Sequence, residues 1–219
     1  MFITLEGIEG SGKTTQVAHI VHFMEQNKID CVVTREPGGT LIGEKIRTIL
    51  LDPENRDLDS VSELLLYAAD RAQHVKTKVL PLLLSGKTVI CDRFFDATIA
   101  YQGFARGLDM ELINRLNKIV LDDLRPDMTI LFDLPASTGL ERAWKQLNVG
   151  ARVSNESRFE KETLEFHEKV RAGYLELADR EPDRFKIVDA SMDEMQVKGK
   201  IFEILSQHLE NKPSIQDAD

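Results

Sequence analysis

A glycine-rich turn near the N-terminus constrains the fold of this chain more than any other feature of the sequence. Residues 7–14 read GIEGSGKT and match the pattern G-x-x-x-x-G-K-[ST] in full. The turn follows an apolar run, FITL at residues 2–5, and opens a stretch of helical character from Lys13 to Gln26. Glycines let successive backbone N–H groups point into one cavity, and the start of the following helix adds partial positive charge. The pattern therefore predicts an α/β fold with a site for the phosphates of a nucleoside triphosphate.

The side chains of this turn have distinct predicted tasks. We expect the Lys13 ammonium to reach the β- and γ-phosphates and the Thr14 hydroxyl to ligate Mg²⁺. The residues expected to contact the triphosphate are Gly7, Ile8, Glu9, Gly10, Ser11, Gly12, Lys13, Thr14 and Thr15. The alternative is a glycine-rich turn without a ligand, and the full match between a strand and a helix argues against it.

The rest of the chain alternates between short apolar runs and stretches of helical character. Five runs are nearly continuous in apolar residues, as strands buried on both faces of a parallel sheet are: residues 2–5, 31–34, 88–91, 128–132 and 185–188. Helical stretches fill the gaps at residues 13–26, 41–51, 62–84, 111–121, 138–145, 159–179 and 195–209. Pro81 is expected to end or kink the third of them. The alternation predicts a P-loop NTPase fold, with a five-stranded parallel sheet and helices on both faces.

The domain organisation is expected to be simple. No linker rich in Pro, Gly or Ser divides the chain, so we predict a single domain over residues 1–219. Residues 145–158 are polar and lack an apolar period, which favours a mobile lid at about residues 142–158. The polar end of the chain, at about residues 210–219, is expected to fray.

Composition excludes several classes of protein. The chain has 28 Lys and Arg against 37 Asp and Glu, a net charge of −9, which is unfavourable for a protein that coats a nucleic acid polymer. Its apolar runs are too short to span a bilayer, and its N-terminus has no signal-peptide pattern. Cys31 and Cys91 lie in separate β-branched runs, which indicates buried reduced thiols. These features together predict a cytoplasmic protein with no membrane and no nucleic acid partner.

Two other patterns are not assigned a function. Residues 27–30 read NKID, which matches the guanine-reading motif of GTPases. They lie at the end of the first helix and not after a later strand, and no D-x-x-G switch occurs in the chain. His19 and His22 lie one helical turn apart with no further metal ligand nearby in the sequence, so a surface pair is the favoured interpretation.

A second set of polar residues follows the other strands. The run at residues 88–91 ends in Asp92 and Arg93, and the carboxyl ends of parallel strands face one crevice. Asp92 is therefore placed to hold Mg²⁺, and Arg93 is placed to clamp a phosphate. Three segments surround this dipeptide in the sequence: REPGGT at residues 35–40, YAADR at 67–71, and DRFFDATIAYQG at 92–103.

These segments resemble those of the bacterial thymidylate kinases (dTMP kinases), a family of P-loop nucleoside monophosphate kinases. The phosphate loop with an acid at Glu9, the three segments above, and residues 158–170 occur in the order and at the spacing of that family. The resemblance extends to about Asp189. It implies the reaction of ATP and dTMP to ADP and dTDP, in the synthesis of dTTP. It also implies Mg²⁺ bound with ATP and a homodimer.

The resemblance also implies roles for individual residues of the acceptor site. Tyr67 and Arg71 are four residues apart and share one helix face. The resemblance implies that Tyr67 stacks on thymine and that Arg71 donates to a base carbonyl. Tyr101 would lie against the 2′ position of the sugar, and Thr98 and Gln102 would read the polar edge of the base. The full set implied to bind dTMP is Glu9, Glu36, Pro37, Arg47, Tyr67, Arg71, Arg93, Thr98, Tyr101 and Gln102. The residues implied to take part in catalysis are Glu9, Lys13, Arg93 and Arg158.

The resemblance further implies that a lid arginine contacts the transferring phosphoryl group. The residue after Glu9 is Gly10 and not arginine, as in the members that carry this arginine in the lid. The candidates are Arg142, Arg152 and Arg158, of which Arg158 matches best, and Arg142 is also assigned to ATP binding. By analogy with nucleoside monophosphate kinases, adenine is expected near residues 189–192.

Two other functions remain open on the sequence alone. A different nucleoside monophosphate kinase would share the phosphate loop and the lid, with dUMP, CMP or AMP as acceptor. A non-catalytic nucleotide-binding regulator would bind the triphosphate without an acceptor pocket and would turn over little. Turnover of several monophosphates with ATP separates the three.

Overall fold

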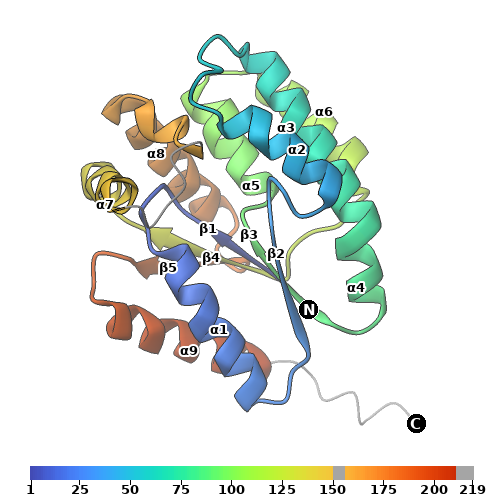
Figure 1. Ribbon diagram of the computed structural model, residues 1–219. Helices are drawn as coiled ribbons and strands as arrows, with labels where there is room; N and C mark the ends of the chain where they lie inside the picture. The colour runs from blue at the N-terminus through green and yellow to red at the C-terminus, as the bar shows by residue number, and fades with distance from the viewer. Residues whose placement is uncertain (150–155, 211–219) are drawn as a thin grey trace.

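A parallel sheet forms the centre of the protein. The computed structural model describes residues 1–149 and 156–210 (Figure 1). The strands are ordered β2-β3-β1-β4-β5 and every neighbouring pair is parallel. Their bounds are β1 (Phe2–Glu6), β2 (Cys31–Arg35), β3 (Thr88–Asp92), β4 (Met128–Asp133) and β5 (Phe185–Asp189). The predicted five-stranded parallel sheet is confirmed.

Each strand runs one residue further than the apolar run that predicts it. The added residues are all charged: Glu6, Arg35, Asp92, Asp133 and Asp189. Because the strands are parallel, these residues lie along one edge of the sheet. The apolar parts of β1 and β4 are fully buried at the centre, so the sheet holds this charged edge on a rigid base.

Helices cover both faces of the sheet, as predicted. Figure 1 shows α1 and α9 side by side on one face, and α3, α5 and α8 on the other. The helices are α1 (Lys13–Gln26), α2 (Leu41–Leu51), α3 (Ser60–His74), α4 (Leu80–Leu84), α5 (Phe95–Thr98), α6 (Met110–Leu121), α7 (Ala136–Asn148), α8 (Leu164–Arg180) and α9 (Glu194–Glu210). None of the helices in the described ranges is long and apolar enough to cross a bilayer.

The helical stretch predicted over residues 62–84 changes its hydrogen bonding ahead of its proline. The α-helix α3 ends at His74, a π-helical turn spans Val75–Val79, and α4 begins at Leu80. Pro81 lies in the first turn of α4, where a missing N–H is tolerated. The expected end of the helix at Pro81 is not observed, because helical backbone continues through this residue to Leu84; the α-helical hydrogen bonding is interrupted ahead of it, by the π-helical turn.

The helix predicted from Phe159 to Asp179 begins later than expected. Residues Phe159–Lys161 form a 3₁₀ turn, and α8 starts at Leu164. Thr163 caps α8, since its hydroxyl accepts from the Phe166 N–H at 3.2 Å. A threonine at this position sets the start of a helix more strongly than the apolar period does.

One helical segment was not predicted. Residues 95–105 form α5 and a π-helical turn, Ile99–Ala105. Most of the segment is buried, including the polar residues Asp96, Thr98 and Gln102. The polar side chains of this segment face an internal site and not solvent. Its sequence therefore lacks the amphipathic pattern of a surface helix.

Candidate active site

One cavity of about 570 Å³ opens above the charged edge of the sheet. It joins the phosphate loop to the segments after β2 and β3 and to the inner face of α3. Nearly all of the residues predicted to bind nucleotides line it: Glu9, Gly10, Ser11, Gly12, Lys13, Thr14, Thr15, Glu36, Pro37, Arg47, Tyr67, Arg71, Asp92, Arg93, Thr98, Tyr101 and Gln102. The structure therefore brings the predicted donor and acceptor residues together in one space.

Gly7 and Gly10 give the phosphate loop a backbone conformation that a residue with a Cβ could not adopt without strain. Gly7 and Gly10 have φ values of 141° and 70°. A Cβ on Gly10 would meet the Gly139 carbonyl oxygen at 2.1 Å, and one on Gly7 would meet the Phe132 carbonyl oxygen at 2.6 Å. The loop thus packs tightly against β4 and α7 on one side, and its residues 9–14 line the cavity on the other.

Lys13 spans the phosphate loop from within. Its Nζ donates to the carbonyl oxygens of Gly7 at 2.8 Å and Ile8 at 3.0 Å, and to Ser11 Oγ at 3.2 Å. Burial, reinforced by the charge of Arg93, lowers the pKa of Lys13 from its usual value to about 8. An anionic phosphate beside this ammonium would favour its charged form, so ligand binding and the charge of Lys13 support each other.

Glu9, in the phosphate loop, is the centre of a buried polar cluster. Its Oε1 accepts from Arg93 at 2.9 Å and from the Tyr101 hydroxyl at 2.6 Å. Its Oε2 lies 3.1 Å from His167 Nδ1. Burial opposes the charge of Glu9, but Arg93 and His167 outweigh it and hold the pKa of this carboxyl well below its usual range. Glu9 is therefore a fixed anion that orients the Arg93 guanidinium.

His167 is a functional residue that the sequence analysis did not assign. Its Nε2 lies 2.9 Å from the Phe159 carbonyl oxygen, and its Nδ1 faces Glu9. The Phe159 carbonyl and the Glu9 carboxylate can both only accept, so this environment favours the charged imidazolium form of His167. Burial disfavours this charge, but the hydrogen bond and the charge of Glu9 outweigh it and raise the pKa of His167 above its usual value of 6.5.

The His167 imidazolium predicts a pH-dependent stability. A raised folded-state pKa contributes stability that is fully present below the unfolded-state pKa and is lost as the pH rises through the folded-state pKa. Denaturant unfolding should therefore show a steeper loss of stability in the native protein than in His167→Gln as the pH rises above the ordinary histidine pKa of about 6.5. Equal pH slopes in the two proteins would contradict an imidazolium at this position.

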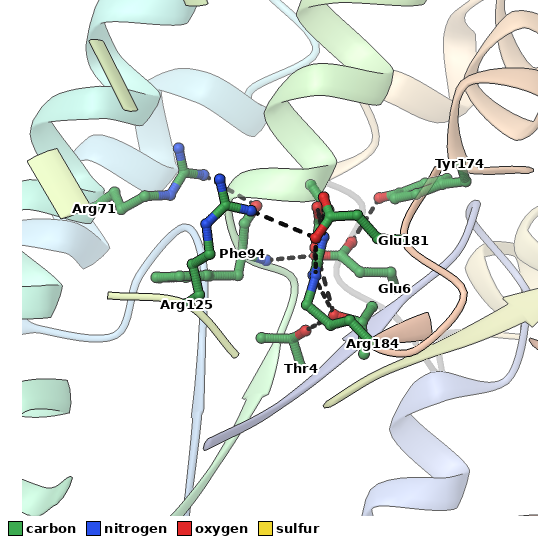
Figure 2. A network of polar contacts seen from close by, with 10 residues as sticks. Thr4, Glu6, Arg71, Phe94, Arg125, Tyr174, Glu181 and Arg184 are labelled. Atoms are coloured by element: carbon green, nitrogen blue, oxygen red, sulfur yellow. Dashed lines mark hydrogen bonds and ion pairs between the residues drawn. The ribbon is translucent and has the colours of Figure 1, made fainter. Parts of the chain in front are cut away.

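Arg93 is fixed through its backbone as well as its side chain. Its φ of 67° is unusual for a residue with a side chain. The next N–H, of Phe94, donates to Glu6 Oε1 at 2.7 Å, and the Tyr174 hydroxyl donates to Glu6 Oε2 at 2.7 Å (Figure 2). Tyr174 also accepts from Arg93 at 3.3 Å. These contacts hold a strained backbone so that Arg93 points into the cavity.

Burial raises the pKa of Glu6 to about 8, and the charge of Asp96 adds to the effect. Asp96 itself pairs with Arg184 at 2.6 Å. Figure 2 shows Glu6 next to Arg184 and Tyr174, under the start of α5. The network therefore links the end of β1 to α8 and supports the cavity from below.

The acceptor half of the cavity contains a ring, a guanidinium and unpaired polar atoms. Tyr67 and Arg71 both line it from α3. Arg71 is nearly fully buried, and it donates to Glu36 Oε2 at 2.7 Å and to the Phe94 carbonyl oxygen at 3.1 Å. Thr98 Oγ1 is buried without a hydrogen-bond partner among the described residues. A buried hydroxyl without a partner is unfavourable, so this position suits a polar ligand atom.

Arg47 and Asp92 also line the cavity. Arg47 donates to Glu156 at 2.9 and 2.6 Å and to the Pro37 carbonyl oxygen at 3.0 Å. Within the described ranges, Asp92 Oδ1 is buried and accepts no hydrogen bond. A carboxylate oxygen of this kind fits a hard cation such as Mg²⁺, and Thr14 lines the same cavity.

Two of the predicted arginines lie outside the cavity. Arg158 is buried, donates to the Leu50 carbonyl oxygen, and pairs with Glu63 at 2.6 Å. Arg142 donates to the Ala190 carbonyl oxygen at 2.9 Å, which places α7 beside the segment predicted to bind adenine. Arg152 lies outside the described residues, as do residues 150–155 of the predicted lid and residues 211–219 of the polar C-terminal tail.

Several cavity residues were not assigned from the sequence. They include Arg35, Phe94, Gln146, Glu156, Phe159 and Glu160. His167 and Tyr174, which support Glu9 and Arg93, are seven residues apart on one face of α8. Polar aromatic residues repeated on the buried face of a helix are the signal that could have identified them.

The chain was then compared with known proteins. The family model for thymidylate kinase matches residues 5–201. The chain is 55% identical to the thymidylate kinase of Desulfosudis oleivorans over 207 residues, which cover 94% of this chain and 97% of that protein. It is 57% identical to that of Desulforapulum autotrophicum over 209 residues, covering 95% and 92%.

A solved structure agrees with these sequence comparisons. The crystal structure of thymidylate kinase from Ehrlichia chaffeensis superimposes with a TM-score of 0.74 at 36% identity, covering 94% of this chain and 98% of that one. Fold, cavity residues and sequence thus lead to one assignment: this chain belongs to the thymidylate kinase family.

Proposed function

We propose that this protein transfers the γ-phosphoryl group of ATP to dTMP, giving ADP and dTDP for the synthesis of dTTP. The observation that carries the proposal is the continuity of the cavity from the phosphate loop at Lys13 to the ring of Tyr67 and the guanidinium of Arg71. Membership of the thymidylate kinase family supports the same donor and acceptor.

The residues of the cavity suit a phosphate acceptor. The second pKa of a phosphate monoester is about 6, so its oxygen is already largely anionic near neutral pH and needs no general base. What the reaction needs is alignment and neutralisation of charge. Lys13, Arg47 and Arg93 supply cations along the cavity. We assign Lys13 to the transferring group, and Arg47 and Arg93 to the phosphate of dTMP.

Mg²⁺ is the metal that this reaction requires, and we assign it to Thr14 and Asp92. The unpaired Asp92 oxygen and the Thr14 hydroxyl, both at the cavity, offer the oxygen ligands that Mg²⁺ prefers. When bound with ATP, the ion would neutralise charge on the β- and γ-phosphates.

Base recognition is assigned to the α3 and α5 side of the cavity. Tyr67 would stack on thymine, and Arg71, Thr98 and Gln102 would meet its polar edge. Tyr101, fixed by its hydrogen bond to Glu9, would crowd a 2′-hydroxyl. In this proposal Glu36 and Pro37 form the wall beside Arg71, and Glu9 orients the arginine that holds the acceptor.

Product analysis tests the proposal directly. A mixture of the enzyme with ATP, Mg²⁺ and dTMP should form ADP and dTDP in equal amounts. Phosphorus NMR can monitor both products. ATP hydrolysis without dTDP would point to a nucleotide-binding regulator. Faster product formation from CMP or AMP would instead support another nucleoside monophosphate kinase.

We further propose that the protein is a homodimer. Exposed apolar side chains gather on the neighbouring helices α2, α3 and α6, where Ile49, Leu65 and Ile119 are 45%, 50% and 75% exposed. Such a patch suits an interface between two copies. A monomer in sedimentation velocity at micromolar concentration would contradict this proposal. The cytoplasmic location stays a prediction from the sequence.

A further inference from the structure

A partly buried group of charged side chains is hydrogen-bonded to Gln102, which lines the acceptor half of the cavity. Glu63, on α3, is fully buried. Its Oε1 accepts from Gln102 Nε2 at 2.7 Å, and its Oε2 accepts from Arg158 Nη2 at 2.6 Å. Arg106 donates to both oxygens at 3.3 Å and also to Glu162 at 2.6 Å. Two carboxylates thus face two guanidinium groups in a closed cluster.

The chemistry of Glu63 fixes the orientation of the Gln102 amide. Both oxygens of Glu63 already accept hydrogen bonds from guanidinium groups, so the Gln102 group that faces this carboxylate is the NH₂. The carbonyl oxygen Oε1 is then at the other end of the amide. Gln102 lines the cavity, and within the described part of the chain its side chain makes no hydrogen bond besides that to Glu63. Its oxygen is the atom left for a ligand.

We propose that Glu63 is a positioning residue for base selection, which holds Gln102 so that the cavity offers a hydrogen-bond acceptor to the base. This inference rests on the proposed function. The N3–H of thymine donates to such an acceptor, whereas N3 of cytosine carries no hydrogen and is itself an acceptor. Arg158 and Arg106 serve this arrangement by holding the Glu63 carboxylate in place. The structure thereby gives Arg158 a task remote from the transferring phosphoryl group.

The variant Glu63→Gln tests the proposal because its effect on Gln102 has a definite direction. The new amide must keep its oxygen toward Arg158, which can only donate. Its NH₂ then faces Gln102, and Gln102 must turn its own oxygen to that NH₂ and its NH₂ to the cavity. We expect the ratio of kcat/KM for dTMP over that for dCMP to fall at least about tenfold, since unmatched buried groups cost this much or more.

Glu162→Gln is the matched control. It removes one negative charge from the same cluster, next to Arg106, but Glu162 makes no contact with Gln102. Its dTMP-to-dCMP ratio should stay within about threefold of the native ratio. A purely structural role of Glu63 would scale the rates for both acceptors together and leave the ratio unchanged in both variants.

The double variant Glu63→Gln, Gln102→Glu gives a second, independent test. It keeps the total charge, and the new carboxylate at residue 102 accepts from the new amide and offers its other oxygen to the cavity. The preference for dTMP should return to within about threefold of the native value. This variant decides the question if the single variant does not fold, as judged by circular dichroism.

Three results would overturn the proposal: a folded Glu63→Gln enzyme with the native ratio, a fall of equal size in Glu162→Gln, or a folded double variant without preference for dTMP. Failure of the proposed function is a different result. It would show as a native enzyme that does not phosphorylate dTMP at all, before any variant is made.

Discussion

Lys13→Ala should lower kcat by about a thousandfold, while the protein keeps its fold and its unfolding midpoint within a few degrees. Lys13 is the cation inside the phosphate loop, held there by the Gly7 and Ile8 carbonyl oxygens and by Ser11. Negative charge spreads over the transferring group in the transition state, and a fixed ammonium in a buried cavity stabilises it far more than water does. Steady-state kinetics with saturating ATP and dTMP measure the effect.

Lys200→Ala is the control for this loss. Lys200 lies on α9, is about half exposed, and pairs only with the nearby Glu203 among the described residues. Its replacement should leave kcat unchanged. A Lys13→Ala enzyme with more than about a tenth of the native kcat would contradict the assignment of this lysine to the phosphoryl group.

Arg93→Met should lower kcat/KM for dTMP by about a hundredfold or more. The substitution keeps much of the length of the side chain and removes the charge that Glu9 orients from one side and Tyr174 from the other. Loss of a fixed guanidinium at the acceptor phosphate weakens the binding of dTMP and the alignment of its phosphate. The value of kcat should therefore fall and the KM for dTMP should rise.

The matched variant is Tyr174→Phe, which removes one contact to Arg93 and retains the guanidinium and Glu9. We expect a smaller loss than in Arg93→Met, since this variant removes the two hydrogen bonds of the Tyr174 hydroxyl, from Arg93 and to Glu6, but keeps the guanidinium charge and its ion pair with Glu9. If Arg93→Met raised KM for ATP alone and left the dTMP parameters unchanged, Arg93 would belong to the donor site.

The strands and the phosphate loop could be predicted from the sequence because their determinants are local. Each buried strand is a continuous apolar run, and a parallel sheet then brings the residues after β1, β2 and β3 to one edge. The loop depends on glycines whose positive φ values are needed within six residues of one another. The cavity-lining residues that the family resemblance implied follow from this geometry.

The determinants of the missed features are distant in the sequence. Residues 95–105 have no apolar stripe because several of their buried side chains face the cavity or a buried ion pair. The pairing of Arg158 with Glu63 could not be predicted, because the two residues are 95 positions apart and no periodicity connects them. The imidazolium of His167 depends in the same way on Glu9, which belongs to a different element.

The central claim is that the cavity selects the thymine base of a deoxynucleoside monophosphate, and one measurement tests it most directly. The kcat/KM of the native enzyme should be determined for dTMP, dCMP, CMP and AMP at the same saturating concentration of ATP and Mg²⁺. A donor at Arg71 and an acceptor at Gln102 both mismatch cytosine, so dTMP should exceed dCMP at least about tenfold, and CMP and AMP should be poorer still. An enzyme that accepts dCMP or AMP as readily as dTMP would contradict the account.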